Sequence, residues 1–280
     1  MCLVAKPRGP TSHDVVDIVR RALATSRVGH LGTLDPFAEG LLVVVVGRAT
    51  RLAPYAAAWR KSYDGVIRLG ATTSTDDATG AVTGTSGAWQ ALDAGAVRAA
   101  AAHLVGALEQ RPPAYSAVKV DGVRAYRRAR RGEAVVMAPR RVTVFALEVT
   151  AWRPPDVEFR ATVSGGTYLR SLARDLGERL GCGAHLAALR RTAVGPFRLD
   201  DAVAPQAVTA ADVRDPAALV ADLPRRVLTG DEREAIRHGR PIPVRESESG
   251  TIVLMAAGSL LGLGEVVDGQ LKPRVVLADA

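Results

Sequence analysis

The sequence predicts an α/β (α+β) protein, in which helices and strands are mixed along the chain, with a small β-rich unit at its C-terminal end. Apolar residues recur at helical spacing in residues 13–24 and 167–181. Residues 63–69 and 157–163 instead alternate between apolar and polar, as half-buried strands do. The chain has 280 residues, 48% of them hydrophobic, so it can bury a core in one large domain with an appendage, or in two domains.

The N-terminal third predicts a strand, a helix and a second strand. Residues 1–10 read as a strand that runs into a loop, without the apolar segment of a secretory signal. Ser12 is a candidate N-cap for the helix over 13–24. The strand over 63–69 places Tyr63 on its apolar side.

The middle of the chain begins with a turn-rich segment, residues 72–80. We expect a helix over 91–110 and then a strand over 114–123 with an Asp-Gly turn at 121–122. The strand over 157–163 completes this part of the predicted order.

The last third predicts one long helix, a linker and the small C-terminal unit. The helix over 167–181 has an apolar face, and Gly181 suits the position that follows its end. Residues 202–224 contain prolines and acidic breaks, so they predict a linker. The tail from 225 predicts a helix over 231–238 and several short strands.

Composition favours a cytoplasmic protein without a disulfide framework. Cys2 and Cys182 are the only cysteines, and no apolar run is long enough to cross a bilayer. The five histidines show no metal-ligand spacing, so we expect no metal site.

The positive charge lies in the first 224 residues. Net charge is +8, and the tail from 225 carries eight basic and eight acidic residues, so the body carries 29 basic and 21 acidic ones. A basic body suggests a polyanionic partner, for which nucleic acid is the usual choice. The arginine excess over lysine suits RNA, although the arginine codons of a GC-rich genome explain most of that excess and less of the net charge.

Asp35 has both a structural and a chemical interpretation. Asp-Pro is common at turns and helix starts, and on that evidence alone the structural interpretation is favoured. Gly29, Gly32 and Gly40 would however allow a ligand to approach the backbone closely, and His30 adds a polar group.

Three other features carry the same ambiguity. Arg170 lies at the start of the helix over 167–181, where it is either a solvated side chain or the partner of an acid. Tyr63 is a core tyrosine by default. The segment from Arg124 to Arg141 holds seven arginines, which suit a solvated face or a phosphate-binding one.

Five ordered motifs resemble the bacterial tRNA pseudouridine synthases of the TruB family. The motifs are K-P-R-G-P-T-S-H-D-V-V (6–16), G-H-L-G-T-L-D-P-F-A-E-G-L-L (29–42), K-S-Y-D-G-V-I-R-L-G (61–70), Y-S-A-V-K-V-D-G-V-R-A-Y (115–126) and G-T-Y-L-R-S-L-A-R-D-L-G (166–177). The resemblance runs from residue 3 to about 200, and the tail faintly resembles the PUA-like RNA-binding domain that closes these proteins. It implies a pseudouridine-synthase fold with a mixed, largely antiparallel sheet over 1–224 and a PUA-like domain over 225–280.

The resemblance also implies roles for individual residues. Asp35 matches the aspartate that attacks the target uridine, at either C6 or C1′. Tyr63 matches the tyrosine that stacks on the base and takes the C5 proton, and Arg170 matches the arginine that pairs with the aspartate. The residues that the resemblance assigns to substrate binding are His30, Gly32, Tyr168, Leu189, Lys6 and Lys119.

The chain departs from the family pattern at three positions. Ala5 stands where the family usually has Asp, Leu31 where it has Thr, and Glu39 where it has Thr. These changes concern the loops around Asp35 and RNA affinity, and they leave the chemistry intact.

The activity that we expect is conversion of uridine to pseudouridine in the T loop of tRNA, at conventional position 55. It is an isomerisation that needs no cofactor, and the expected partner is the T-stem loop of tRNA, bound by a monomer. One alternative is a non-catalytic protein that binds or folds tRNA. A nucleotide enzyme with a glycine-rich loop is disfavoured, because neither phosphate-binding glycine motif occurs.

Overall fold

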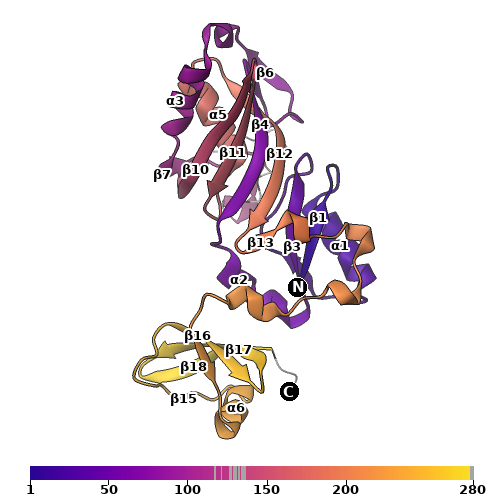
Figure 1. The fold of residues 1–280 in the computed structure, drawn as a ribbon, viewed down its shortest axis with the longest axis vertical. Helices are drawn as coiled ribbons and strands as arrows, with labels where there is room; N and C mark the ends of the chain where they lie inside the picture. The colour runs from indigo at the N-terminus through magenta and orange to yellow at the C-terminus, as the bar shows by residue number, and fades with distance from the viewer. Residues whose placement is uncertain are drawn as a thin grey trace.

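The computed structural model describes residues 1–116, 118–120, 122–125, 128, 131, 133 and 137–277. Within this part of the chain, two sheets lie one above the other along the long axis of the molecule (Figure 1). The larger sheet belongs to the body of the molecule, and the smaller one is formed by the C-terminal tail. This is the mixed α+β arrangement that the sequence predicts.

The large sheet has nine strands among the described residues, and its main path runs β1-β3-β12-β4-β11-β10-β7. Its strands are β1 (Cys2–Lys6), β2 (Val28–His30), β3 (Glu39–Val46), β4 (Lys61–Leu69), β7 (Gly106–Gln110), β10 (Arg140–Arg153), β11 (Asp156–Val163), β12 (Ala184–Val194) and β13 (Phe197–Arg198). All pairs are antiparallel except β3 with β12, which confirms the mixed, largely antiparallel sheet.

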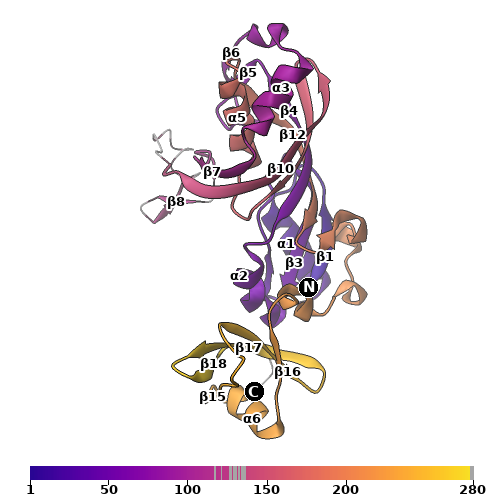
Figure 2. The same cartoon turned by 60° about the vertical axis from the view of Figure 1, so that its left-hand side comes forward.

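Helix α3 (Ala94–Ala102) packs on β10 and helix α5 (Leu169–Arg179) packs on β12 (Figures 1 and 2). Helix α5 buries the predicted apolar face, and Gly181 follows its end with a φ of +71°. Two further helices belong to the β1–β3 side of the body, α1 (Ser12–Ala22) and α2 (Ala53–Ala56). Among the described residues, no helix is long and apolar enough to cross a membrane.

Two small hairpins form separate two-stranded sheets. The hairpin of β5 (Ala71–Thr73) and β6 (Val82–Thr85) contains the predicted turn segment. The other pairs β8 (Lys119–Val120) with β9 (Val123–Arg124), on either side of the predicted turn, and β8 lies well out to the side of the sheet in Figure 2. Of the arginine-rich segment, Tyr126, Arg127 and Arg130 lie outside the described residues.

The small sheet has the order β14-β16-β17-β18-β15. Its strands are β14 (Arg225–Val227), β15 (Ile242–Pro243), β16 (Thr251–Ala256), β17 (Ser259–Val267) and β18 (Gln270–Val276), and helix α6 (Gly230–Arg237) packs beside it. The predicted helix and short strands of the tail are confirmed.

An apolar cluster joins the tail to the body. Val253, Leu263 and Val275 of the small sheet share it with Leu52 and Leu219. Arg51, next to Leu52, donates hydrogen bonds to the carbonyls of Val276 (3.0 Å) and Arg274 (3.3 Å). The two parts therefore meet in a packed interface.

Three sequence predictions are wrong in detail. The N-cap of α1 is Thr11 and not Ser12, because Thr11 and Asp14 form a reciprocal capping box while the hydroxyl of Ser12 bonds to Leu34. The helix predicted over 91–110 ends at Ala102, because Gly106–Gln110 instead forms an edge strand that pairs with β10.

The predicted linker over 202–224 packs on the body instead of spanning a gap. Ala5 donates to the carbonyl of Val203 (2.8 Å), and Val203 donates to that of Leu3 (3.1 Å). Val208 and Leu219 are buried, at 4% and 1% exposure. The segment forms the 3₁₀ turns Pro205–Ala207, Ala210–Asp212 and Pro216–Val220.

Candidate active site

The loop between β2 and β3 carries Asp35 on a turn that is hydrogen-bonded to the start of α1. Ser12, at the start of α1, donates to the carbonyl of Leu34 (2.9 Å) and accepts from its N–H (2.8 Å). The carbonyl of Asp35 accepts from the N–H of Ala38 (3.1 Å), which closes the turn. The Asp35 side chain on this turn is 35% exposed.

Arg170 pairs with Asp35 across 135 residues of chain. Nη2 of Arg170 donates to Oδ1 of Asp35 at 3.2 Å, and Nε lies 2.9 Å from Oδ2 without the angle of a hydrogen bond. The guanidinium therefore meets the carboxylate side-on. Arg170 is 4% exposed, so it is not the solvated side chain that its place on the polar side of the helix suggested.

Three further contacts hold the Arg170 guanidinium in place. Nη1 lies 3.6 Å from Oδ2 of Asp77 and donates to the carbonyl of Thr75 (3.0 Å). Nη2 also donates to the carbonyl of Tyr115 (2.9 Å). The sequence analysis missed Asp77, whose only signal was an acid pair within a segment that read as a turn.

Burial raises the pKa of Asp35, and the nearby charge of Asp77 raises it further, while Arg170 opposes both effects. Asp35 thus combines a partly exposed carboxylate with surroundings that remove much of its solvent. This combination suits a group that acts on a bound molecule rather than one that only stabilises a turn.

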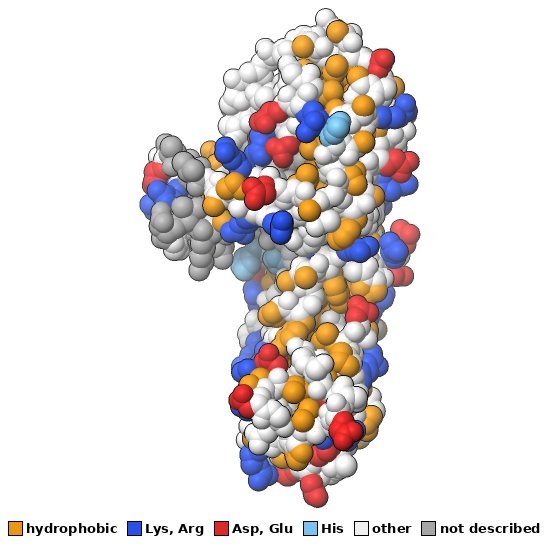
Figure 3. Space-filling model, turned by 90° about the vertical axis from the view of Figure 1, so that its left-hand side faces the viewer, with side chains coloured by type: hydrophobic (Ala, Val, Ile, Leu, Met, Phe, Trp, Pro, Cys, Tyr) orange, Lys and Arg blue, Asp and Glu red, His pale blue; other side chains and the backbone are white. Residues whose placement is uncertain are grey.

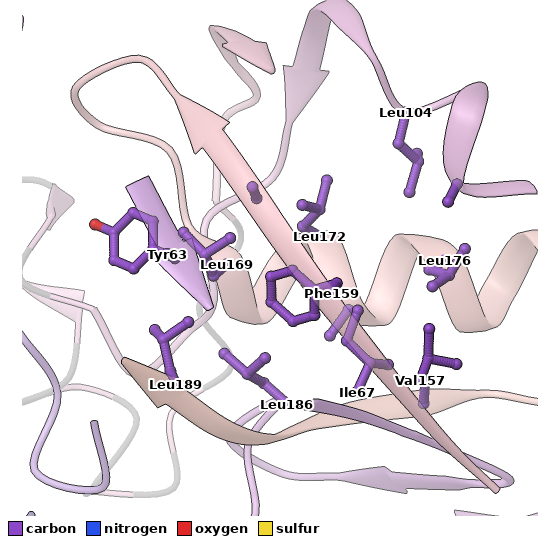
Figure 4. Packing of buried hydrophobic residues seen from close by; sticks show 14 of the residues in the cluster. Tyr63, Ile67, Leu104, Val157, Phe159, Leu169, Leu172, Leu176, Leu186 and Leu189 are labelled. Carbon is purple, nitrogen blue, oxygen red and sulfur yellow. The ribbon is translucent and has the colours of Figure 1, made fainter. Parts of the chain in front are cut away.

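Tyr63 lies at one end of the main apolar cluster. Its ring is 5% exposed and lies with Leu169 and Leu189, which come from α5 and β12. In Figure 4 the hydroxyl of Tyr63 points away from the packed side chains of Phe159 and Leu172. Leu34, the neighbour of Asp35, belongs to the same cluster. Tyr63 therefore shares one apolar cluster with the residue that precedes Asp35.

Tyr168 precedes Arg170 and is tied to the segment that leads to β8. Its N–H donates to Oε1 of Gln110 (2.8 Å), and its carbonyl accepts from Nε2 of Gln110 (3.1 Å). Burial raises the pKa of the Tyr168 phenol, while the Ser116 hydroxyl beside it lowers that pKa. The charge of Asp35 also raises the pKa of the Tyr168 phenol.

His30 lies on β2, and its Nδ1 is buried without a hydrogen-bond partner. Burial lowers the pKa of His30, and the charges of Arg191 and His13 lower it further. A neutral imidazole with an unsatisfied nitrogen can bind a polar group of a ligand.

Three further residues were predicted to bind substrate, namely Lys6, Gly32 and Lys119. Lys6 is 1% exposed and donates to carbonyls of its own surroundings, including Ala38 (2.6 Å). Gly32 has a φ of +88°, and a Cβ there would lie 3.1 Å from Cε of Lys61. The backbone of Lys119 pairs in β8, and its side chain lies outside what the structure describes.

Gly40 is a glycine because another strand approaches it. A Cβ at Gly40 would collide with the backbone of Arg191, where β3 and β12 run side by side. The close approach that the glycines of this loop suggested is therefore made at Gly40 by the protein's own backbone.

Leu31 and Glu39, two of the residues that depart from the family pattern, contact side chains other than those of Asp35 and Arg170. Leu31 is 4% exposed within the apolar cluster that joins body and tail, and Glu39 forms an ion pair with Arg8 at 3.4 Å. Neither contact involves Asp35 or Arg170.

Charged side chains of both signs are interspersed on the face that Figure 3 shows, and no continuous basic surface covers it.

Among the described residues, no group of three or more His, Cys, Asp or Glu side chains could hold a metal ion.

Comparison with known proteins gives matches along almost the whole chain. The model of the TruB family pseudouridylate synthase N-terminal domain matches residues 20–169. Two C-terminal models follow it, that of the tRNA pseudouridylate synthase B C-terminal domain at 170–231 and that of the pseudouridine synthase II TruB C-terminal domain at 224–277.

Curated relatives and solved structures agree with these matches. A tRNA pseudouridine synthase B of Thermobifida fusca is 47% identical over 99% of this chain and 97% of its own length, and one of Cutibacterium acnes is 46% identical over 98% and 97%. A Cbf5-Nop10-Gar1 complex contains a chain with a TM-score of 0.72 and 25% identity, over 99% of this chain and 83% of that one. An H/ACA RNP bound to a substrate RNA has a TM-score of 0.73, at 22% identity over 99% and 84%, which shows a shared fold.

Proposed function

The chain belongs to the TruB family of pseudouridine synthases, which isomerise uridine to pseudouridine, and from this premise we propose that its substrate is the T loop of tRNA, at conventional position 55. The names of the curated relatives support tRNA as the substrate. The side-on contact between the buried Arg170 guanidinium and the partly exposed Asp35 carboxylate is the observation that best supports catalysis.

In the proposed reaction, Asp35 is the nucleophile. The C1′–N1 bond of uridine breaks, the detached uracil turns, and a C1′–C5 bond forms. The C5 hydrogen then leaves as a proton and N1 gains one, so atoms and electrons balance without a co-reactant. Attack by Asp35 at C6 or at C1′ gives a covalent intermediate, and the bond between Asp35 and the substrate breaks again before pseudouridine leaves, which restores the carboxylate.

Arg170 keeps Asp35 oriented and favours its ionised form through opposite charge. Because the guanidinium also binds two backbone carbonyls and Asp77, it does not have to reorganise when the substrate enters. This fixed position is what we expect of a group that directs a nucleophile.

Tyr63 and the leucines beside it would hold the loose base. The Tyr63 ring offers a stacking surface, and its outward hydroxyl is the group that we propose takes the C5 proton. Leu189 would form the apolar wall that keeps water from the intermediate.

Residues around Asp35 would recognise the RNA. The target base lies inside a folded loop, so it must leave its stack before Asp35 can reach it. We propose that the unsatisfied Nδ1 of His30 and the phenol of Tyr168 bind the displaced nucleotides, that Lys6 and Gly32 shape the loop under them, and that Lys119 binds phosphate from the β8–β9 hairpin.

We propose the same two domains that the sequence predicts, a catalytic domain over 1–224 and a PUA-like RNA-binding domain over 225–280. The start of the small sheet at β14 supports this boundary. The charge-neutral tail would contribute contacts of shape rather than of charge.

Release of tritium from C5-labelled uridine in unmodified tRNA transcript tests the proposal. The wild-type protein should release tritium from the T-loop uridine, and a transcript with cytidine at that position should give none. Asp35→Asn should release none while still binding tRNA, because it removes the nucleophile and little surface. A wild-type protein that binds the transcript but releases no tritium would favour the alternative of a non-catalytic tRNA-binding or folding protein.

A further inference from the structure

Arg191 is a fully buried cation directly beneath the loop that carries Asp35. It lies on β12, is 1% exposed, and is one of the largest side chains in the protein to be buried to this extent. None of the ion pairs among the described residues includes it. A buried charge without a charged partner is costly, so its retention calls for a reason other than packing.

The hydrogen bonds of Arg191 all go to one segment. Nε donates to the carbonyl of Leu41 (2.8 Å), Nη2 to that of Gly32 (3.0 Å) and Nη1 to that of Thr33 at 3.5 Å. These carbonyls lie on both sides of Asp35 in the chain. The guanidinium therefore ties together the two ends of the loop on which the carboxylate is mounted.

The backbone of Arg191 fixes the same loop a second time. It pairs with Gly40 where β12 runs parallel to β3, and Gly40 leaves no room there for a side chain. Lys6 holds the middle of the loop from the other side, since Nζ donates to the carbonyls of Ala38 (2.6 Å) and Pro36 (3.5 Å). Arg191 is the only one of these two cations that reaches both ends.

Strand β12 also connects this clamp with the wall of the pocket. Leu189 lies two residues before Arg191, and alternate residues of a strand point to the same side. Leu189 packs beside Tyr63 while Arg191 binds the loop. One strand thus sets the position of the apolar wall relative to that of the Asp35 loop.

We propose that Arg191 is a positioning residue for the isomerisation, which holds the Asp35 loop in register with the pocket wall through its three carbonyl contacts. This inference rests on the proposed function of Asp35. Arg191 touches neither substrate nor reacting atoms, so its effect should appear in the rate of the chemical step and not in RNA affinity.

The experiment compares Arg191→Lys and Arg191→Gln with a matched variant, Arg226→Lys. Arg226 is also a buried arginine, at 3% exposure, but it lies in the small sheet and pairs with Glu232 and Glu248. Three quantities are measured for each protein: the single-turnover rate of tritium release with enzyme in excess, the dissociation constant for tRNA, and the midpoint of thermal unfolding.

Arg191→Lys keeps the charge but cannot reach three carbonyls, so its single-turnover rate should fall about a hundredfold, as a displacement of about 1 Å can cause. Its tRNA affinity should equal that of the wild type. Arg226→Lys should lower the unfolding midpoint without lowering this rate. The inference is overturned if Arg191→Lys reacts at the wild-type rate, or if Arg226→Lys loses as much rate as Arg191→Lys.

Asp35→Asn in the same assay separates this inference from the proposed function. If Asp35→Asn still reacts, the proposed function fails; if it is inactive while Arg191→Lys is fully active, only the role of Arg191 fails. The wild-type protein supplies a measurement that needs no folded variant. The Nε proton of Arg191 should exchange with solvent far more slowly than those of exposed arginines, and fast exchange would overturn the clamp.

Discussion

Arg170 and Asp77 form an ion pair that solvent hardly reaches, since each side chain is 5% exposed and Nη1 lies 3.6 Å from Oδ2. Asp77 itself is held by Thr75 and Thr79, whose side-chain hydroxyl and backbone N–H, respectively, donate to Oδ1 at 2.8 and 2.9 Å. Arg170, which pairs with Asp35, is thus also held by a second carboxylate. We therefore expect Asp77 to support the catalytic role that we propose for Asp35.

Asp77→Asn should slow the chemical step. The amide can keep the contacts of Oδ1 with the threonines, but it loses the negative charge beside Arg170 and can place an NH₂ group against Nη1. We expect the single-turnover rate to fall about tenfold to a hundredfold, as for other displaced catalytic groups. Asp156→Asn, which breaks the exposed pair of Asp156 with Arg68, is the control and should react normally. An equal rate in both variants would contradict the role of Asp77.

Arg170→Lys should be far more damaging than a conservative change. A lysine cannot contact Asp35 side-on while it also binds the carbonyls of Thr75 and Tyr115. We expect a loss of kcat of about a hundredfold or more, comparable to the loss of a preorganised donor. Arg174→Lys, one helical turn along, is a matched control. An unchanged kcat in the Arg170→Lys protein would show that the pair has no part in catalysis.

The pH dependence follows from the raised pKa of Asp35. The nucleophile must be ionised, so the single-turnover rate should be lost as pH falls through the pKa in the folded protein, which lies above the usual value for Asp. In Asp77→Asn the charge that raises this pKa is gone, so the acid limb should move to lower pH, whatever the maximum rate. A limb that moves to higher pH in that variant would contradict this assignment.

Tyr63→Phe should retain the stacking ring and lose the phenolic oxygen. We expect normal tRNA binding and a reaction that stalls after the base has moved, because the C5 proton has no acceptor. Tritium release under single-turnover conditions measures this step. Tyr55→Phe is a control outside the Tyr63 cluster. Equal release rates for Tyr63→Phe and wild type would leave only the stacking role.

The arginine-rich segment should carry much of the phosphate binding. Replacing Arg127, Arg128, Arg130 and Arg131 with Ala should flatten the dependence of log K on log[salt] by up to about one unit for each phosphate group that the variant no longer binds. Arg128 and Arg131 lie 2.9 and 3.9 Å from Glu133 oxygens, so these two should contribute less than a full unit each. The control replaces Arg225, Arg233, Arg237 and Arg240 in the neutral tail. A flatter slope in the control than in the first variant would place the phosphate contacts in the tail.

Local patterns predicted the elements whose apolar period is undisturbed. The strand over 157–163 and the helix over 167–181 appear as β11 and α5, because their burial follows their own sequence. The predicted helix over 91–110 is too long, because the pairing of β7 with β10 is a contact between distant segments that no local pattern contains. The linker predicted over 202–224 is wrong for the same reason, since its hydrogen-bond partners include residues of β1.

In the candidate site, too, local patterns predicted some residues, while others depend on contacts between distant segments. The motif around Asp35 pointed to the carboxylate, and the helix start pointed to an acidic partner for Arg170. Asp77 and Arg191 remained hidden, because their roles depend on partners that lie far from them in the sequence. An arginine within a strand pattern reads as solvated unless its burial is known.

The packed interface between tail and body has a consequence for how a long RNA is held. Val253, Leu263 and Val275 share one apolar cluster with Leu52 and Leu219, so the two parts cannot separate without exposing that cluster to water. The small sheet therefore stands at a set distance from the Asp35 pocket. An RNA can therefore contact both only if its length matches this distance. An RNA helix of another length could reach the Asp35 site or the small sheet, but not both at once.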